Sequence, residues 1–463
     1  MMQASIAVIG GGITGLVAAR RLVGAGHAVT LYESGGRLGG QVRTEQFLGH
    51  AVDVGAESLH LAGPNAQLLD ELGLTDQLVT AEASFAWIWD GVKRRRLPAG
   101  MGPAGPTRMW PIVRSGALSP LGMARAGLEP LLPPTPEQHV GADTDVSVGA
   151  FIGRRFGDQV TDRLVDPVLG SLHSGDVHRL SMRAATPMLA AKATRNRSLL
   201  LGSARSGHSP PSFVTFPGGL STLIEGLLAG TDVDVRLATP VDAIEPSGSR
   251  YRLIAAGADQ RDFDGVVLAL PAAPALGLLQ PLLGEDAAPL GTLRTASVAT
   301  VAVAWDASEA ASCEALRATG ILTPAKAGTL MKAATFLSTK WPHLRHPDHA
   351  LLRLSAGRVG EHRVASLPDE QLVGQMVDEL RRATGLTGVP IQAQVYRWPH
   401  ALPQLEVGHL EKLAVVRSAL AQRPALALVG AAYDGLGISS CIAAGQRGAE
   451  TMIDQLALNE EAR

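Results

Sequence analysis

A glycine motif near the start of the chain limits what this sequence can fold into. An apolar run of strand character ends at Ile9, and a stretch with the apolar spacing of a helix begins at Ile13. Gly10 and Gly12 lie between these two segments, and Gly15 lies in the first turn of the expected helix. Bare backbone at such a turn permits the close approach of a pyrophosphate, which the positive end of the helix attracts. The motif therefore predicts a Rossmann-type dinucleotide-binding unit.

The next strand adds features that decide between dinucleotides. It ends on Glu33, eighteen residues after Gly15, where such units place the carboxylate that binds a ribose hydroxyl. The segment SGGRLGGQVRT follows at once and carries Arg37, Gly39 and Gly40. It resembles the R-x-G-G continuation of amine-oxidase-like flavoproteins, which lies along the flavin half of the cofactor. We therefore expect FAD rather than NAD, bound in part by these residues.

Two later segments have the pattern of further pieces of the same unit. In the first, a glycine-opened amphipathic helix over residues 216–230 leads into a strand. Val235 of that strand lies where its backbone can meet the adenine. In the second, over residues 425–450, a strand and a glycine-rich turn precede a helix whose N-terminus can face the flavin. The residues expected to bind the cofactor there are Gly430, Gly437 and Ile438.

The remaining sequence predicts two further parts, so that the expected fold class is α/β. Strand-like runs alternate with helices through the second half of the chain, which indicates a mixed sheet in a substrate domain. Helical periodicity dominates an earlier stretch and indicates a helical lobe. The predicted parts are a discontinuous Rossmann-type FAD-binding domain (1–79, 213–270 and 424–463), a substrate-binding domain (80–98, 197–212 and 271–423) and a helical lobe (99–196).

Composition excludes several classes of function. The formal net charge of −2 gives no reason to expect a nucleic-acid partner. The only cysteines, Cys313 and Cys441, have neither metal-ligand spacing nor the number for a disulfide framework, so we expect no metal site. We find neither a signal-peptide pattern nor a continuous apolar stretch of about 18 residues, the length that could span a bilayer. We therefore expect a cytoplasmic protein.

Motifs along most of the chain resemble the oxygen-dependent protoporphyrinogen/coproporphyrinogen III oxidases of haem biosynthesis. The discriminating block is SVGAFIGRRFGDQVTDRLVDPVLGSLHSGDVHRLS, residues 147–181. A second is YRWPHALPQLEVGHLE, residues 396–411. Amine oxidases and carotenoid desaturases share the first glycine motif but lack these blocks.

The resemblance implies an FAD-dependent oxidase that converts coproporphyrinogen III to coproporphyrin III with oxygen. Six hydrogens leave in three flavin turnovers, each yielding peroxide, and flavin N5 carries the chemistry, so no catalytic side chain is expected. It implies a helical lobe that can rest on the inner face of a membrane and a ferrochelatase-type enzyme as the next partner. It also implies a substrate pocket lined by Val168, Leu169, Gly170 and Ser171.

One position departs from the family. Its members commonly place an Arg or Lys at the start of a strand to hold a substrate propionate, and this chain has Ser84, Phe85 and Ala86 there. The cation is either missing, or its role has passed to one of the basic residues that follow. These are Lys93, Arg94, Arg95 and Arg96.

Three alternatives stay open on the sequence alone. The substrate can be protoporphyrinogen IX, although an Arg- and Ala-rich composition, typical of high-GC bacteria, favours coproporphyrinogen III. The chain can be another amine-oxidase-like flavin oxidase, since Cys441 lies in the general region where some members attach the flavin covalently. Finally, the missing cation is compatible with a non-catalytic, FAD-containing porphyrin-binding protein.

Overall fold

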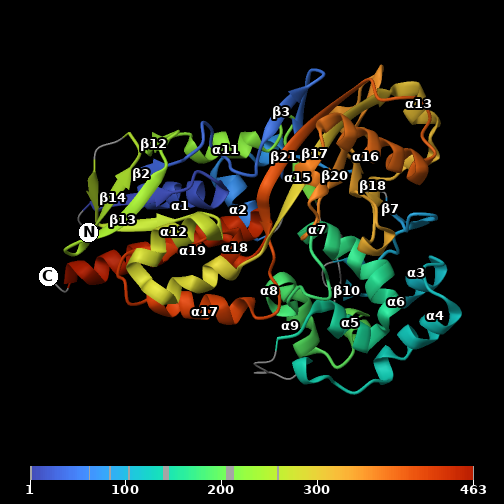
Figure 1. The fold of residues 1–463 in the computed structure, drawn as a ribbon, viewed down its shortest axis with the longest axis horizontal. Helices are drawn as coiled ribbons and strands as arrows, with labels where there is room; N and C mark the ends of the chain where they lie inside the picture. The colour runs from blue at the N-terminus through green and yellow to red at the C-terminus, as the bar shows by residue number, and fades with distance from the viewer. Residues whose placement is uncertain are drawn as a thin grey trace. The chain divides into compact units, whose positions relative to one another are not determined.

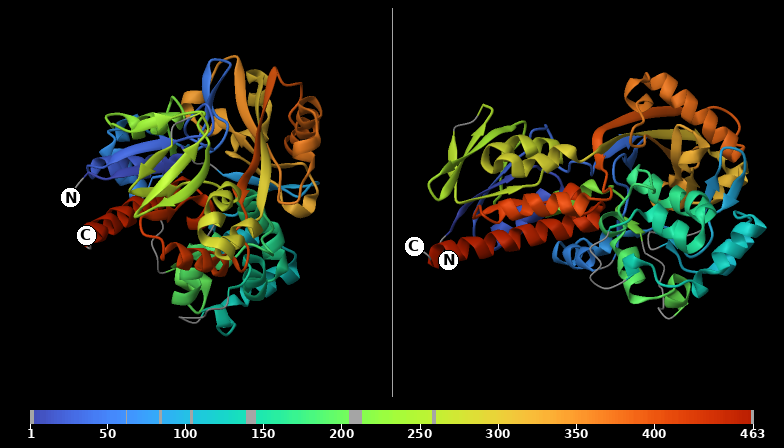
Figure 2. Two further views of the ribbon diagram at one scale, coloured as in Figure 1. Left: turned by 60° about the vertical axis from the view of Figure 1, so that its left-hand side comes forward. Right: turned by 60° about the horizontal axis from the view of Figure 1, so that its bottom comes forward.

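The chain folds into two units, each assembled from separated stretches of sequence. The computed structural model describes residues 3–61, 63–82, 85–102, 105–138, 145–204, 213–257 and 260–461. Unit 1 comprises Met1–Leu78, Ser212–Leu293 and Leu410–Arg463, and unit 2 comprises Val79–Pro211 and Arg294–His409. Figures 1 and 2 show the course of the chain.

Unit 1 is built on a five-stranded parallel sheet. Its strand order is β12-β2-β1-β16-β22, and every neighbouring pair is parallel. The chain leaves β1 toward β2 on one side and reaches β16 on the other only much later, so the carboxyl end of β1 is a topological switch point. The strands are β1 (Ser5–Ile9), β2 (Ala28–Tyr32), β12 (Asp234–Arg236), β16 (Gly265–Leu268) and β22 (Leu426–Leu428).

Alternating side chains of β1 anchor two hydrophobic layers, one on each face of this sheet. Ile6 and Val8 belong to the core that includes helices α1, α2, α11 and α19, whereas Ala7 and Ile9 belong to the core that includes α12 and α17. Helices α1 and α19 lie side by side (Figure 1). The bounds are α1 (Ile13–Gly24), α2 (Pro64–Glu71), α11 (Ser221–Leu228), α12 (Ala272–Leu283), α17 (His409–Leu420), α18 (Ala431–Asp434) and α19 (Ile438–Glu461).

Smaller strands complete unit 1. The hairpin of β3 and β4 follows the second glycine pair, and β5 pairs with β11. An antiparallel sheet of β13, β14 and β15 adds Tyr251 and Phe263 to the core on the α12 side. The bounds are β3 (Thr44–Phe47), β4 (His50–Asp53), β5 (Leu59–His60), β11 (Phe213–Thr215), β13 (Val241–Ser247), β14 (Arg250–Ala255) and β15 (Arg261–Phe263).

Unit 2 contains a seven-stranded mixed sheet. The order is β21-β17-β20-β19-β18-β7-β8, and only the β18–β7 pair is parallel. Helix α16 (Asp369–Thr384) packs Leu372, Met376 and Leu380 into a core with this sheet. The strands are β7 (Ala86–Trp89), β8 (Arg94–Arg96), β17 (Thr295–Asp306), β18 (Gly320–Leu322), β19 (Met331–Phe336), β20 (His349–Ala356) and β21 (Gln392–Pro403).

The rest of unit 2 is a helical lobe with a core of its own. Its centre is α5, which continues through α6 into a ten-residue π-helix, Thr161–Gly170. Such long π-helical stretches are rare, and π-helical segments occur frequently at functional sites. The other helices are α3 (Met109–Arg114), α4 (Pro120–Gly127), α5 (Val148–Phe156), α6 (Asp158–Val160), α7 (Ser171–His173), α8 (Met182–Ala185), α9 (Pro187–Arg195) and α10 (Leu199–Ala204).

The predicted α/β fold class is confirmed, but three predicted boundaries are corrected. Residues 271–293 lie in unit 1, because Leu278 and Leu279 of α12 pack with the antiparallel sheet. Residues 410–423 also lie in unit 1, because Leu413 and Val416 join the same core. Residues 197–204 pack with the helical lobe rather than with the sheet of unit 2. The lobe and that sheet form one unit.

A buried ion pair holds the lobe together. Arg155, from the GRRFGD motif of α5, lies 2.5 Å from Glu129, and both side chains are completely buried. Arg155 also donates to the carbonyls of Pro133 and Arg197, at 2.7 and 2.8 Å. Glu129 accepts from the hydroxyl of Ser198 at 2.5 Å. The pair therefore joins three separate stretches of chain, with the lost hydration of both charges replaced by hydrogen bonds.

Replacing Arg155 by Met is expected to lower the free energy of unfolding by about 3–5 kcal/mol, because it leaves the buried Glu129 carboxylate without its counter-charge. Arg345→Met is the control, since Arg345 pairs with Glu82 on the surface of the same unit and both are half exposed. The control should lose about 0–1 kcal/mol. Chemical denaturation followed by circular dichroism measures both, and equal losses would show that the lobe does not depend on this pair.

Candidate functional site

The first glycines are required by two different kinds of close approach. A Cβ at Gly10 would lie 2.4 Å from the carbonyl oxygen of Ala269, and a Cβ at Gly15 would lie 2.0 Å from that of Gly10. Both positions therefore exclude side chains through contacts within the protein itself. A Cβ at Gly12 would meet nothing within 4 Å, although the backbone there is ordinary extended chain with φ of −73°. The space beside Gly12 fits a group from outside the chain.

This space lies at the N-terminus of α1. Gly12 is the N-cap residue, and it has no side chain that could satisfy the first N–H groups of the helix. These N–H groups and the helix dipole form a positive end that suits a phosphate. The second glycine pair closes on the same turn, because the Gly39 N–H donates to the Gly11 carbonyl at 2.8 Å and Gly12 bridges to Gly39. The donor set thus fits the pyrophosphate of the expected dinucleotide.

Glu33 is fixed at the end of β2 beside this turn. Its carboxylate accepts from the backbone N–H groups of Gly11 and Gly35, at 2.8 and 2.7 Å. Its own N–H donates to the Arg236 carbonyl at 2.9 Å, so Val235 on β12 lies on the neighbouring strand, opposite Leu31. The carboxylate and the β12 backbone therefore lie along the same edge of the sheet.

Arg37 orders the second glycine loop. Its guanidinium donates to the carbonyls of Leu38, Gly40 and Val42, at 3.0, 2.6 and 3.3 Å. Partial burial and the nearby Arg43 charge lower the pKa of Arg37 from its usual range, and it remains charged at neutral pH. These bonds direct Arg37 toward the loop, so that it shapes the backbone of Gly39 and Gly40.

The C-terminal return reaches the same place through α19. A Cβ at Gly445 would lie 2.5 Å from the Thr14 carbonyl, so α19 packs closely on the first turn of α1. Burial raises the pKa of the Cys441 thiol above its usual value. Gly430 and Gly437 adopt φ of +134° and +100°, conformations that favour glycine. The side chain of Ile438 is buried in the core, which leaves its backbone at the start of α19.

The structure therefore brings the predicted cofactor residues of unit 1 to one end of the parallel sheet. They come from three separate stretches of sequence. Asp53, which is not one of these residues, is structural, because its carboxylate accepts from the Thr44 hydroxyl at 2.6 Å and from the Leu220 N–H at 2.9 Å. The residues brought together are Gly10, Gly12, Gly15, Glu33, Arg37, Gly39, Gly40, Val235, Gly430, Gly437 and Ile438.

The predicted substrate residues lie in unit 2, at the end of the π-helix. Leu169 is fully buried in the lobe core, and a Cβ at Gly170 would lie 2.5 Å from a carboxylate oxygen of Asp166. The Ser171 hydroxyl donates to the backbone carbonyl of Lys332 at 3.2 Å. Val168 is only half-buried. This segment is therefore tightly held, with Val168 the member whose side chain is least enclosed.

Sequence reasoning missed a group of buried polar side chains beside this segment. Lys332 of β19 is 5% exposed, and burial lowers its pKa to about 7. His173 is also buried, and burial lowers its pKa to about 4, so its imidazole is neutral at pH 7. A lysine inside the otherwise apolar run LMKAATF was the available signal. The other members of the group are Ser174, Thr323, Arg358 and Gln404.

The four basic residues considered as propionate ligands form the edge of the unit 2 sheet. Arg94 donates to the carbonyls at the end of α16, and Arg95 pairs with Asp90 at 2.5 Å. The Arg96 guanidinium lies 4.1 Å from the centre of the Phe85 ring, and Lys93 is exposed in the hairpin turn. Ser84 lies outside the described residues. These contacts hold Arg94 and Arg95 in structural roles.

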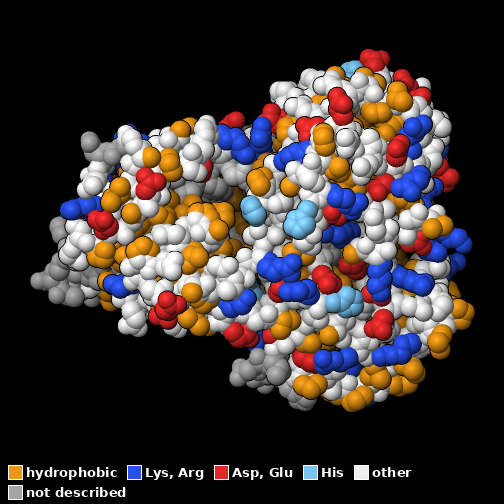
Figure 3. All heavy atoms as spheres, viewed as in Figure 1, with side chains coloured by type: hydrophobic (Ala, Val, Ile, Leu, Met, Phe, Trp, Pro, Cys, Tyr) orange, Lys and Arg blue, Asp and Glu red, His pale blue; other side chains and the backbone are white. Residues whose placement is uncertain are grey.

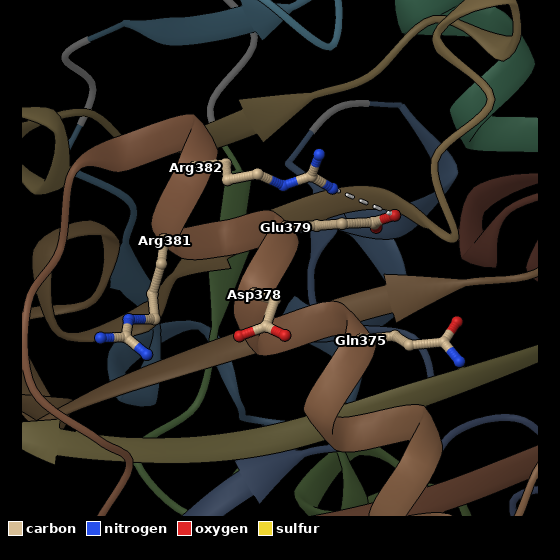
Figure 4. A pocket seen from close by; sticks show the side chains of 5 residues that line it. All are labelled: Gln375, Asp378, Glu379, Arg381 and Arg382. Carbon is tan, nitrogen blue, oxygen red and sulfur yellow. Dashed lines mark ion pairs between the residues drawn. The ribbon is translucent and has the colours of Figure 1, made fainter.

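A pocket along α16 contains none of the predicted cofactor or substrate residues. Figure 4 shows its lining residues Gln375, Asp378, Glu379, Arg381 and Arg382 along one helix, with Arg381 directed away from the Arg382–Glu379 ion pair. Glu379 accepts from the N–H groups of Leu330 and Met331, at 3.0 and 2.7 Å. It thus fixes the start of β19, a structural role.

Comparison with known proteins agrees with the geometry. Residues 13–453 match the family described as flavin containing amine oxidoreductase. A coproporphyrinogen III oxidase from Propionibacterium freudenreichii subsp. freudenreichii is 32% identical, over 97% of this chain and 90% of that protein. One from Mycobacterium tuberculosis is 32% identical, over 98% of this chain and 99% of that protein.

A crystal structure supports the same relationship. The protein, from Exiguobacterium sp. 255-15, has been suggested to be a protoporphyrinogen oxidase. It superposes with a TM-score of 0.84 at 29% identity, covering 98% of this chain and 99% of that one. The prediction of a flavin-dependent oxidoreductase with FAD is confirmed at the level of the family. The chain belongs to the flavin-containing amine oxidoreductases and, within them, to the family of the porphyrinogen oxidases.

Proposed function

We propose that this protein is an FAD-dependent oxidase that converts coproporphyrinogen III to coproporphyrin III, with oxygen as the electron acceptor. The observation that carries the proposal is the 32% identity to coproporphyrinogen III oxidases over nearly the whole chain. The open space beside Gly12, at the uncapped end of α1, supports a bound dinucleotide. Coproporphyrinogen III is the proposed substrate because both relatives are coproporphyrinogen III oxidases.

In this proposal unit 1 holds FAD. The N-terminus of α1 binds the pyrophosphate at Gly12, the Glu33 carboxylate accepts a ribose hydroxyl, and the Val235 backbone meets the adenine. The backbone of Gly430, Gly437 and Ile438 faces the flavin. When bound, FAD supplies the two-electron redox chemistry that no side chain can provide.

Unit 2 provides the substrate side of the reaction in this proposal. Val168, Leu169, Gly170 and Ser171 form the wall against which the macrocycle rests. These residues position the substrate and exclude water, so their substitution alters the KM more than the chemical step. No catalytic acid or base is assigned.

The proposal also covers the surroundings of the protein. We propose a cytoplasmic enzyme that passes its porphyrin to a ferrochelatase-type enzyme, because a metal-free porphyrin is the substrate of metal insertion. We propose that the helical lobe contacts a membrane surface peripherally. Among the described residues, no helix combines the length and the hydrophobicity needed to cross a bilayer.

Aerobic turnover of the purified yellow protein should yield three molecules of peroxide for each porphyrin formed, and coproporphyrinogen III should react faster than protoporphyrinogen IX. Porphyrin fluorescence and peroxide are measured together. A faster reaction with protoporphyrinogen IX would identify that compound as the substrate and leave the proposed oxidation unchanged. Porphyrin binding without turnover of either would indicate a non-catalytic porphyrin-binding protein. Turnover of amines alone would indicate an amine-oxidase-like enzyme.

Gly12→Ala should weaken FAD binding at least about tenfold, because the new methyl group occupies the space assigned to the pyrophosphate. The stability of the flavin-free protein should change by less than about 1 kcal/mol, since this methyl group meets no protein atom within 4 Å. Gly24→Ala is the matched control, at the other end of α1 and equally unobstructed. Titration of the flavin-free proteins with FAD measures the dissociation constants. An unchanged dissociation constant in Gly12→Ala would show that the pyrophosphate does not bind beside Gly12.

In a flotation experiment the protein should rise with vesicles of anionic phospholipid, because exposed apolar side chains of the lobe insert into the membrane surface. Trp110 of α3, Leu121 of α4 and Leu131 are each more than two-thirds exposed. Figure 3 shows hydrophobic side chains beside basic ones over this part of the molecule. Replacing the three by Ser should abolish flotation. The control is the double variant Val389→Ser and Ile391→Ser, whose side chains lie outside the lobe and are 71% and 56% exposed. It should float as wild type does, and equal loss of flotation in both variants would exclude the lobe as the contact.

A further inference from the structure

Lys332 is buried in unit 2 beside an irregularity of β19. The register of β19 against β20 shifts between Met331 and Ala333, and Met331 and Lys332 are both buried. In a regular strand, neighbouring side chains would point to opposite faces. Bulges of this kind re-aim side chains and occur frequently beside active sites.

The buried ammonium group meets a hydroxyl and other cations. Its hydrogen-bond partner is the Ser174 hydroxyl, on a residue that is itself completely buried. The charges that act most on Lys332 are those of Arg353 and Arg358, and both oppose its protonation. Asp166 and Glu361 both attract Arg358. The Asp166 carboxylate accepts from the Ala325 N–H at 2.7 Å and burial raises its pKa, and Glu361 pairs with Arg363. Among the described residues, neither carboxylate pairs with the ammonium group of Lys332, whose hydrogen-bond partner is a hydroxyl.

Several polar atoms around Lys332 have no hydrogen-bond partner within the described part of the chain. One Nη of Arg358 has none, although its other Nη donates to the Thr323 carbonyl at 2.5 Å. The hydroxyl of Thr323, the Nδ1 of His173 and the Oε1 of Gln404 are likewise buried and unsatisfied. Buried polar groups are normally paired, so this concentration points to a missing ligand. The Nη of Arg358 is a donor, the hydroxyl and the imidazole nitrogen can donate or accept, and the Oε1 of Gln404 can only accept. With the ammonium group of Lys332 and the guanidinium group of Arg358 beside them, the donors favour an anionic ligand.

The group adjoins the segment assigned to substrate. Ser171 bonds to the carbonyl of Lys332 itself, and Ser174 follows three residues later in the left-handed conformation, with φ of +50°. Strain of this kind in a residue other than glycine is found at ligand-binding positions. Arg358 is half-buried, and is therefore less enclosed than the lysine.

We propose that Lys332, Ser174 and Arg358 form a binding site for a carboxylate of the substrate, which on the proposed function is a propionate of coproporphyrinogen III. The carboxylate accepts hydrogen bonds from the ammonium group and from the free Nη of Arg358, and it neutralises the cluster of cations. Family members commonly hold a propionate with an Arg or Lys at a position where this chain has Phe85 and Ala86. In this proposal the Lys332 site performs that role instead. Lys332 is thus a substrate-binding residue.

Proton uptake provides the most direct test, because it needs no variant. In the free protein burial lowers the pKa of Lys332 to about 7. The charges of Arg353 and Arg358 oppose its protonation, and His173 is neutral at pH 7. A carboxylate raises this pKa, so at pH 8 binding of coproporphyrin III should take up nearly one proton, and below pH 6 none. Calorimetry in two buffers of different ionisation enthalpy measures this. The tetramethyl ester of coproporphyrin, which has no carboxylate, should cause no uptake.

Lys332→Gln should raise the KM for coproporphyrinogen III at least about tenfold, change the kcat less than about twofold and abolish the proton uptake. Lys326→Gln is the matched control, an exposed lysine of the same unit that pairs with Asp162, and it should behave as wild type. An unchanged KM and unchanged uptake in the folded Lys332→Gln protein would overturn the assignment. If wild type binds coproporphyrin with uptake but oxidises no porphyrinogen, the proposed function fails and the carboxylate site stands.

Lys332→Met provides a check on folding that is independent of ligand. A lysine whose pKa is lowered by the fold destabilises the folded state fully below about pH 7, and this cost disappears as the pH rises toward the ordinary value of 10.5. The Met variant should therefore melt at a higher temperature than wild type at pH 6, with a smaller difference at pH 9. A lower melting temperature at pH 6 would show that the lysine is a stabilising structural residue and would contradict the proposal.

Discussion

The cofactor unit depends on the contact between Gly15 and the carbonyl oxygen of Gly10, in which no side chain takes part. A Cβ at Gly15 would lie 2.0 Å from that oxygen, so only glycine lets α1 begin directly against the end of β1. This places the positive end of the helix at the switch point of the parallel sheet. The bond from Gly39 to Gly11 and the packing of α19 on Thr14 are then built around the same turn. Three stretches of sequence thus converge on one helix terminus.

Local sequence patterns predicted most elements of this unit. They did not predict which sheet each helix packs against. The helix expected from Ile13 is α1, and Glu33 lies at the end of β2 as its spacing predicted. The helix after Pro271 was expected to belong to the substrate domain, whereas Leu278 and Leu279 pack in the first unit. Apolar periodicity shows that a helix has a buried face, but it does not show which sheet covers that face. Domain boundaries in a discontinuous chain depend on that second fact.

The substrate side was predictable only in part, for a different reason. The resemblance located the segment from Val168 to Ser171, whose position follows from the order of the motifs. Lys332 could not be assigned in the same way, because a lysine in an apolar strand is expected to point outward. Here the lobe covers that side chain, because Ser174 hydrogen-bonds to it and Ser171 bonds to its carbonyl. Such a contact between distant stretches of sequence is not visible in the local pattern. The basic run after Val92, which the sequence made conspicuous, is instead engaged at a sheet edge.

Two buried cations in unit 2 show why incomplete pairing is informative. Arg155 is surrounded by a carboxylate and backbone carbonyls, which replace its lost hydration, so its burial is explained by the stability of the lobe. Lys332 has a hydroxyl for a partner and two guanidinium groups that oppose its charge. A fold that needed only to be stable would gain by replacing such a lysine with an apolar residue. Its presence next to the Nη of Arg358 and the hydroxyl of Thr323, both unpaired among the described residues, is better explained by a ligand that brings negative charge. Sites shaped for binding are locally less stable than the scaffold that holds them.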